Sequence, residues 1–220
     1  MKYIELEKHL FNISDQKFAD FSKSLSNSEY ISIGVKMPIL RQIIKEHIKD
    51  EELKTKDFVL GKYLEVDFIY FGLSLSRFKT IDEQLDFIKE KGKIAKSWVI
   101  TDTIVTYFKK FSFDKYWDFF LKMYQSKYTY DRRIAYVLGL KQYKDHQIIK
   151  ILNYINKNEE YMVMMGEAWL LATMAISEET PVFEFLKNTD DIVLKRKTIS
   201  KICDSFRFNE ESKNRFKSLR

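Results

Sequence analysis

The sequence predicts an all-α protein, and three observations lead to this prediction. Apolar residues recur at intervals of three and four along most of the chain, as they do on one face of an α-helix. No segment of useful length alternates polar and apolar residues as a half-buried strand would. Six glycines and two prolines in 220 residues are few for the turns of a β-protein. We therefore expect helices joined by short connections.

Apolar stripes and boundary residues place the individual helices. Pro38 fits the first turn of a helix that ends near Lys49. The segments 80–83 (TIDE) and 177–180 (SEET) are typical of helix N-termini with capping side chains. Three apolar stripes mark helices within 64–78, 134–143 and 161–175: Leu64, Phe68, Phe71, Leu75 and Phe78; Ile134, Val137, Leu138 and Leu140; Val163, Ala168, Leu171 and Ala175.

The expected helices follow one another in pairs with a regular period. First helices of successive pairs are expected near residues 64, 96, 129, 159 and 192, which gives a unit of about 32 residues. Such units are typical of an α-solenoid of HEAT-like antiparallel helix pairs, whose concave face usually binds the ligand. One or two further pairs are expected before residue 64. Because no linker rich in Gly, Pro or Ser interrupts the chain, residues 1–220 are expected to form a single domain.

Composition limits the possible partners and location. The net charge of +6 permits a polyanionic partner without requiring one. The single cysteine excludes an intramolecular disulfide, and no Cys/His group has the spacing of metal ligands, so we expect no metal site. The N-terminal segment lacks the apolar core of a signal peptide. No run approaches the roughly 18 apolar residues of a membrane span, so we expect no membrane contact and a cytoplasmic location.

The first candidate site is a pair of residues in one helix. Trp98 and Asp102 are four residues apart, so both side chains project from one side of that helix. Each alone has a structural explanation, because tryptophan often lies in the core and aspartate can bind a neighbouring threonine or the backbone. An aspartate within a helix is nevertheless unfavourable and costly to bury without a partner. The pairing therefore indicates a functional site.

Two further candidates lie in the next two pairs. Arg132 and Arg133 open one pair, where they can bind either the neighbourhood of Asp102 or a phosphate; a surface salt bridge is the alternative. Trp169 follows the small residues of Gly166–Ala168, which indicates a close helix contact or the floor of a cleft, with core packing as the alternative.

Basic residues gather near the starts of two units. The first patch includes Lys93 and Lys96, and the second includes Lys195. Basic side chains at the same place in successive units would line one edge, as a duplex backbone requires. The alternative is that these residues are only solvated helix ends.

Several segments, taken in order, match the pattern of one known family. They are Ile33–Arg41, Glu65 in its helix, Ser97–Asp102, Arg132–Ala135, Tyr161–Trp169 and Ile199–Arg207. On these segments the chain resembles the DNA alkylation repair proteins built from HEAT-like repeats, the AlkD-like alkylpurine DNA glycosylases. The resemblance runs from about residue 30 to 208 and implies an α-solenoid that cups duplex DNA.

The resemblance also implies an activity and roles for residues. It implies a monofunctional glycosylase that removes N3- or N7-alkylated purines from duplex DNA without cofactor or metal, in base excision repair, and leaves an abasic site. Asp102 would stabilise the sugar cation and orient water. Trp98 and Trp169 would hold the sugar and phosphate of the lesion. Arg133 would lie near the lesion backbone, with Arg132 as the near alternative.

The sequence departs from this pattern at two positions. Met165 and Ala172 stand where a lysine and an arginine are common among the proteins that the chain resembles, so two basic contacts with DNA are lost. The alternative function is a non-catalytic module that binds nucleic acid or protein through its concave face. Asp102 separates the two, because a carboxylate repels a phosphate backbone and has no use in such a module. In either case we expect a monomer.

Overall fold

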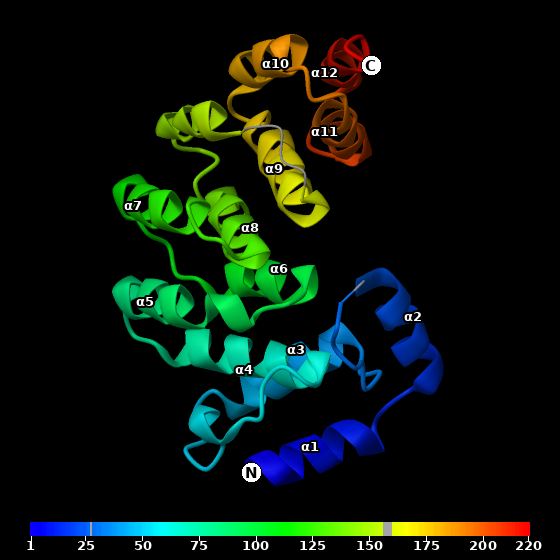
Figure 1. Ribbon diagram of the computed structural model, residues 1–220, viewed down its shortest axis with the longest axis vertical. Helices are drawn as coiled ribbons and strands as arrows, with labels where there is room; N and C mark the ends of the chain where they lie inside the picture. The colour runs from blue at the N-terminus through cyan, green and yellow to red at the C-terminus, as the bar shows by residue number, and fades with distance from the viewer. Residues whose placement is uncertain (27, 156–159) are drawn as a thin grey trace. The chain divides into compact units, whose positions relative to one another are not determined.

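The computed structural model describes residues 1–26, 28–155 and 160–220, and it confirms the all-α prediction (Figure 1). Within these ranges the regular structure is helical, apart from an isolated bridge between Ile31 and Tyr63. The α-helices are α1 (Tyr3–Asn12), α2 (Gln16–Ser26), α3 (Met37–His47), α4 (Leu64–Arg77), α5 (Ile81–Lys91), α6 (Trp98–Tyr107), α7 (Phe113–Tyr124), α8 (Thr129–Leu138), α9 (Tyr161–Met174), α10 (Glu179–Asn188), α11 (Ile192–Asp204) and α12 (Glu210–Lys217). Short 3-10 helices are η1 (Thr55–Asp57), η2 (Gly92–Ile94), η3 (Gly139–Lys141) and η4 (His146–Tyr154).

The chain divides into two compact units, Met1–Lys109 and Lys110–Arg220. The first contains α1 to α6, and the second contains α7 to α12. That residues 1–220 form a single domain stays a prediction.

The predicted repeat is confirmed by the positions at which the helices begin. Residue 159 lies outside the described residues, and the helix expected there begins at Tyr161. The observed first helices of the five pairs are α4, α6, α8, α9 and α11, followed by α5, α7, η4, α10 and α12. In the first unit α4 packs against α6, and in the second α9 packs against both α8 and α11, as in an α-solenoid (Figure 1). The described residues before residue 64 form α1, α2, α3 and the short η1.

Helix α4 is the best-buried helix of the first unit, and it carries a buried carboxylate. Every residue from Leu64 to Leu75 is buried. The Glu65 side chain, 1% exposed, accepts hydrogen bonds of 2.9–3.3 Å from four groups in the loop before α3: Ser32 Oγ and the backbone N–H groups of Ile33, Gly34 and Val35. These bonds satisfy the carboxylate and hold the loop.

Gly34 allows this loop to pass close to the start of α2. Its φ is +98°, and a Cβ atom here would lie 2.2 Å from the Asp15 carbonyl oxygen. Only glycine fits both the left-handed backbone and the contact.

The three predicted helix starts are confirmed, but only one of the two expected side-chain caps is. Pro38 lies in the first turn of α3. Thr80 caps α5 as expected, since its hydroxyl accepts the Glu83 N–H at 3.2 Å and the Glu83 carboxylate accepts the Thr80 N–H at 2.8 Å. The segment 177–180 also contains a helix start, because α10 begins at Glu179. The expected side-chain cap is wrong: α10 has none, and the Ser177 hydroxyl donates to the Tyr143 carbonyl.

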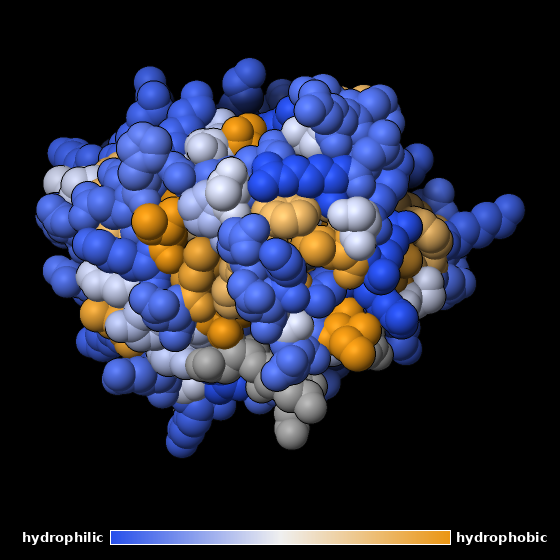
Figure 2. All heavy atoms as spheres, turned by 90° about the horizontal axis from the view of Figure 1, so that it is seen from above, coloured by the Kyte–Doolittle hydropathy of each residue, from blue (hydrophilic) through white to orange (hydrophobic). Residues whose placement is uncertain are grey.

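The surface in Figure 2 is mostly hydrophilic, with apolar side chains in small groups. This agrees with a chain in which 32% of the residues are charged. No helix in the described part of the chain is long and apolar enough to cross a membrane.

Candidate active site

Trp98 and Asp102 lie one turn apart on α6, as predicted, and both are half-buried. The fully buried Ser97 fixes the start of this helix, because its hydroxyl accepts the Val99 N–H at 3.2 Å. The indole Nε1 of Trp98 donates to the Leu25 carbonyl oxygen of α2 at 3.3 Å. The tryptophan is therefore held by two elements.

Asp102 is the only charged side chain in the sequence of α6. The Thr101 hydroxyl lies 3.3 Å from Asp102 Oδ1 and 3.0 Å from the Trp98 carbonyl oxygen, so it can donate to either. Thr101 is fully buried, whereas Asp102 reaches the surface. The arrangement is a carboxylate on an otherwise uncharged helix, beside an indole. It can stabilise a cation or orient a water molecule.

The third tryptophan, Trp117, contacts other aromatic rings and provides a comparison for Trp98 and Trp169. Trp117 stacks on Phe113 and Phe120, with ring centroids 5.8 and 5.4 Å apart, and it meets Tyr154 edge-on. Trp98 and Trp169 are instead in contact with a backbone carbonyl and a lysine. Contacts with other aromatic rings thus account for Trp117, although it is half-exposed like the other two, which stay candidates.

The first basic patch is partly neutralised. Lys93 is exposed in η2, directly before α6. Lys96 Nζ lies 3.3 Å from Glu29 Oε2, and both side chains are more than half exposed. Lys89 and Lys91 also pair with carboxylates, those of Asp86 and Glu90. Such surface pairs contribute little to stability, so a phosphate can compete for these lysines.

The two arginines of α8 have different environments. Arg133 is only 4% exposed, and its Nη1 donates to the Met162 carbonyl oxygen at 2.6 Å, which ties α8 to α9. Arg132 is half-buried; it donates to the Ser126 carbonyl at 2.6 Å and pairs with Glu160. Of the two alternatives, Arg132 is the one nearer to solvent. That either contacts DNA stays a prediction.

Trp169 lies half-exposed on α9, beside α11. The Lys201 ammonium of α11 lies over its ring, 5.9 Å from the centroid. Ala172, one of the two departures, is nearly buried and lines a hollow with Trp169. Lys195 is half-exposed near the start of α11.

The predicted residues thus fall into two groups. Lys93, Lys96, Trp98 and Asp102 follow one another through η2 and into α6 in the first unit. The second unit brings Arg132, Arg133, Trp169 and Lys195 onto α8, α9 and α11, of which α9 packs against the other two. Sequence reasoning missed Lys201. Its signal is a position four residues after Lys197, in a helix expected to begin near residue 192.

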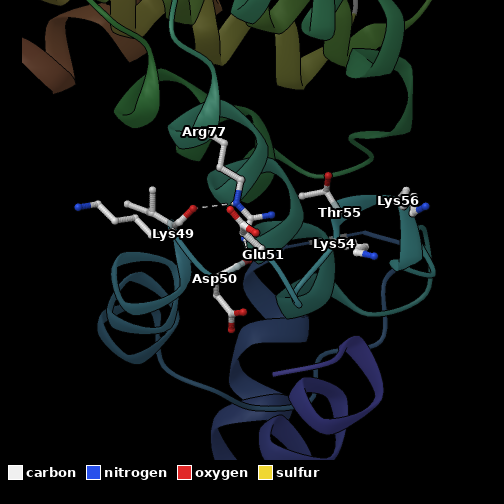
Figure 3. A pocket seen from close by; sticks show the side chains of 8 residues that line it. Lys49, Asp50, Glu51, Lys54, Thr55, Lys56 and Arg77 are labelled. Atoms are coloured by element: carbon white, nitrogen blue, oxygen red, sulfur yellow. Dashed lines mark hydrogen bonds between the residues drawn. The ribbon is translucent and has the colours of Figure 1, made fainter.

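A hollow beside the loop that follows α3 has a structural explanation (Figure 3). Its volume is about 670 Å³, and Arg77, the last residue of α4, lies beside it. The Arg77 guanidinium donates to four carbonyl oxygens at 2.7–3.0 Å: those of His47, Ile48, Asp50 and Leu53. The arginine therefore binds a loop of its own chain. In residues 1–26, 28–155 and 160–220, no cluster of His, Cys, Asp and Glu is suited to hold a metal ion.

Helix pairs stacked in this way define a helical-repeat protein. The chain belongs to the DNA alkylation repair enzyme family, whose sequence model matches residues 6–202.

A solved structure supports the fold. It is described as a "Predicted DNA alkylation repair enzyme from Enterococcus faecalis", with a TM-score of 0.70 and 17% sequence identity. The match covers 87% of this chain and 98% of the other. No curated protein matches the sequence.

Proposed function

We propose that the protein hydrolyses the N-glycosylic bond of N3- or N7-alkylated purines in duplex DNA, with Asp102 as the catalytic carboxylate. The observation that carries this proposal is the half-exposed Asp102 on the otherwise uncharged α6, one turn from Trp98, in a member of a DNA alkylation repair family. The reaction leaves an abasic site for base excision repair. It needs neither metal nor cofactor, and we assign it to a cytoplasmic monomer.

The charge of the substrate explains why one carboxylate is sufficient. A purine alkylated at N3 or N7 is cationic, so the electron pair of the C1′–N9 bond neutralises the base as it leaves. Positive charge then develops on the sugar, where the Asp102 carboxylate stabilises it. Water adds to C1′ and loses its proton to the carboxylate or to solvent. A preorganised charge in a partly dry site can lower such a barrier by about 3 kcal/mol.

Trp98 supports this chemistry through its fixed position. Its indole N–H is bonded to the Leu25 carbonyl, so the ring needs no reordering when DNA binds. A fixed indole beside Asp102 offers a surface against the lesion sugar and excludes water from one side. The electron-rich face of an indole also attracts a developing cation.

Basic side chains in both units supply attraction for the DNA backbone. We assign this role to Lys93, Lys96, Lys195 and Arg132, which reach the surface. We assign Arg133 to the support of α8 against α9, because it is buried. We assign Trp169, in the second unit, to contact with the DNA backbone.

The test is base release from methylated duplex DNA, measured by chromatography of the free base. Wild-type protein is expected to release methylated purines. Asp102→Asn should lower the rate at least about tenfold, equivalent to about 1.4 kcal/mol of transition-state stabilisation, with DNA affinity unchanged. Asp118→Asn is the matched control, because Asp118 is an exposed helical aspartate of α7, and it should have no effect.

One outcome would favour the second candidate, a non-catalytic binding module. One observation favours this module. Lys89, Lys91 and Lys96 pair with carboxylates, which reduces the attraction of the first basic patch for DNA. Wild-type protein that binds methylated duplex yet releases no base over hours would reject the glycosylase and leave the module.

A further inference from the structure

Helices α9 and α11 pack side by side in the second unit (Figure 1). Residues of both helices, with others that follow them, line a small polar pocket. Its volume is about 370 Å³. Lys201 and Arg207 bring two positive charges to its lining, and Asp204 brings one negative charge. The nearly buried Ala172 leaves the pocket open because its side chain is small.

Aromatic rings of neighbouring elements contact the cations along this side of α11. Lys197 Nζ lies 5.8 Å from the centroid of the Tyr161 ring, and Lys201 Nζ lies 5.9 Å from that of Trp169. The Arg207 guanidinium carbon lies 6.0 Å from the Tyr143 ring. A ring face attracts a cation without cancelling its charge, whereas a carboxylate cancels it. These rings therefore hold the side chains in place.

The Lys201 ammonium over the Trp169 ring determines the sign of the charge that a ligand of this pocket can carry. A second cation beside this ring would be repelled by the Lys201 ammonium. An anion is attracted by Lys201 and Arg207 and repelled by Asp204, so the positive charges of the lining exceed the negative one. The pocket therefore suits a phosphate group better than a positively charged base.

We propose that this pocket binds a backbone phosphate of duplex DNA, with Lys201 and Arg207 as its ligands and Lys197 extending the same row. The inference rests on the proposed function and adds a defined subsite to it. A row of cations interleaved with aromatic side chains is the arrangement by which proteins bind the nucleic-acid backbone.

The experiment measures binding of a fluorescently labelled, undamaged DNA duplex by anisotropy at several salt concentrations. The combined variant Lys201→Gln/Arg207→Gln should weaken binding about tenfold at low salt. It should also reduce the slope of log affinity against log salt by about 0.9 for each lost phosphate contact. Lys201→Arg should retain the wild-type slope. Lys187→Gln, which changes an exposed lysine on α10, is the matched control and should have no effect.

A second pair of variants separates charge from shape. Ala172→Glu adds a carboxylate to the pocket, and Ala172→Gln adds a side chain of nearly the same size without charge. The first should weaken DNA binding at least about fivefold more than the second, with thermal melting measured for both. Equal affinities for these two variants, or a wild-type salt slope in the combined variant, would overturn the inference.

The same samples distinguish this inference from the proposed function. Wild-type protein that releases no methylated base, while its DNA binding still depends on Lys201 and Arg207, rejects the glycosylase and supports the phosphate subsite. If wild-type protein releases base and the combined variant binds DNA as wild type does, the glycosylase is supported and the phosphate subsite is rejected. Absence of any salt-dependent binding to DNA rejects both.

Discussion

At the scale of single residues, environment decides how this chain uses its carboxylates. Asp67 is fully buried; it accepts the Tyr30 hydroxyl at 2.7 Å and the Gly61 N–H at 3.0 Å. Burial raises the pKa of Asp67 to about 6, although the bonds from Tyr30 and Gly61 act to lower it. Asp102 is half-exposed on α6. The first carboxylate organises the fold, and the second is accessible to a ligand.

The raised pKa of Asp67 predicts a specific pH dependence of stability. The folded protein binds this proton more tightly than the unfolded chain, so Asp67 stabilises the fold most below about pH 4. That contribution is lost as pH rises through about 6, at about 1.4 kcal/mol for each unit of pKa difference. Asp67→Asn, which is neutral at every pH, should lack this fall. Urea denaturation between pH 4 and 7 measures it.

Asp118→Asn provides the comparison for this measurement, because Asp118 is exposed. Its free energy of unfolding should follow the wild-type pH profile. A profile for Asp67→Asn that is parallel to wild type over the same range would show that Asp67 titrates normally.

At the scale of elements, α4 organises loops at both of its ends. Glu65 near its start binds the loop before α3, and Arg77 at its end binds the loop that follows α3. Both interactions join a charged side chain to backbone groups, so they hold the loops regardless of the loop side chains. This explains why a largely apolar helix retains two charged residues at these positions.

Arg77→Lys should destabilise the first unit although the charge is kept. A lysine cannot reach four carbonyl groups with the planar geometry of a guanidinium, so several carbonyls lose their partner. We expect a loss of about 2 kcal/mol in urea denaturation and faster amide exchange in residues 48–54. Arg41→Lys, at an exposed position of α3, should change neither quantity, and an equal loss in both variants would contradict the loop-binding role.

The elements also show how far sequence reasoning extends. The starts of α4, α8 and α11 were predictable because apolar stripes and capping residues act within a few neighbouring positions. The burial of Arg133 and the position of Lys201 over Trp169 were not. Both depend on the packing of α9 against α8 and α11, which are distant from it in the sequence. Nothing in the local pattern of an arginine or lysine indicates which helix will cover it.

At the scale of the whole molecule, the excess of positive charge predicts salt-dependent association with DNA. The net charge is +6, and the exposed lysines of the two basic patches are its candidate contacts. Affinity for duplex DNA should fall steeply with salt concentration, because bound cations release counterions. Lys93→Ala and Lys195→Ala should each flatten the slope of log affinity against log salt by about 0.9.

Lys122→Ala serves as the comparison, since Lys122 is an exposed lysine of α7 outside both patches. Anisotropy titrations at four or more salt concentrations give the slope. A slope near zero for wild type, or equal slopes for all three variants, would mean that the two patches are only solvated helix ends.

The bond from Trp98 to α2 has a consequence for the evolution of this surface. Its acceptor is a main-chain oxygen, that of Leu25, so substitution of the residue-25 side chain cannot remove it. The outward-facing side chains of α2, among them Phe21 and Leu25, can therefore diverge while the indole keeps its place. The helix that supports Trp98 can in this way acquire new preferences for a ligand without disturbing α6.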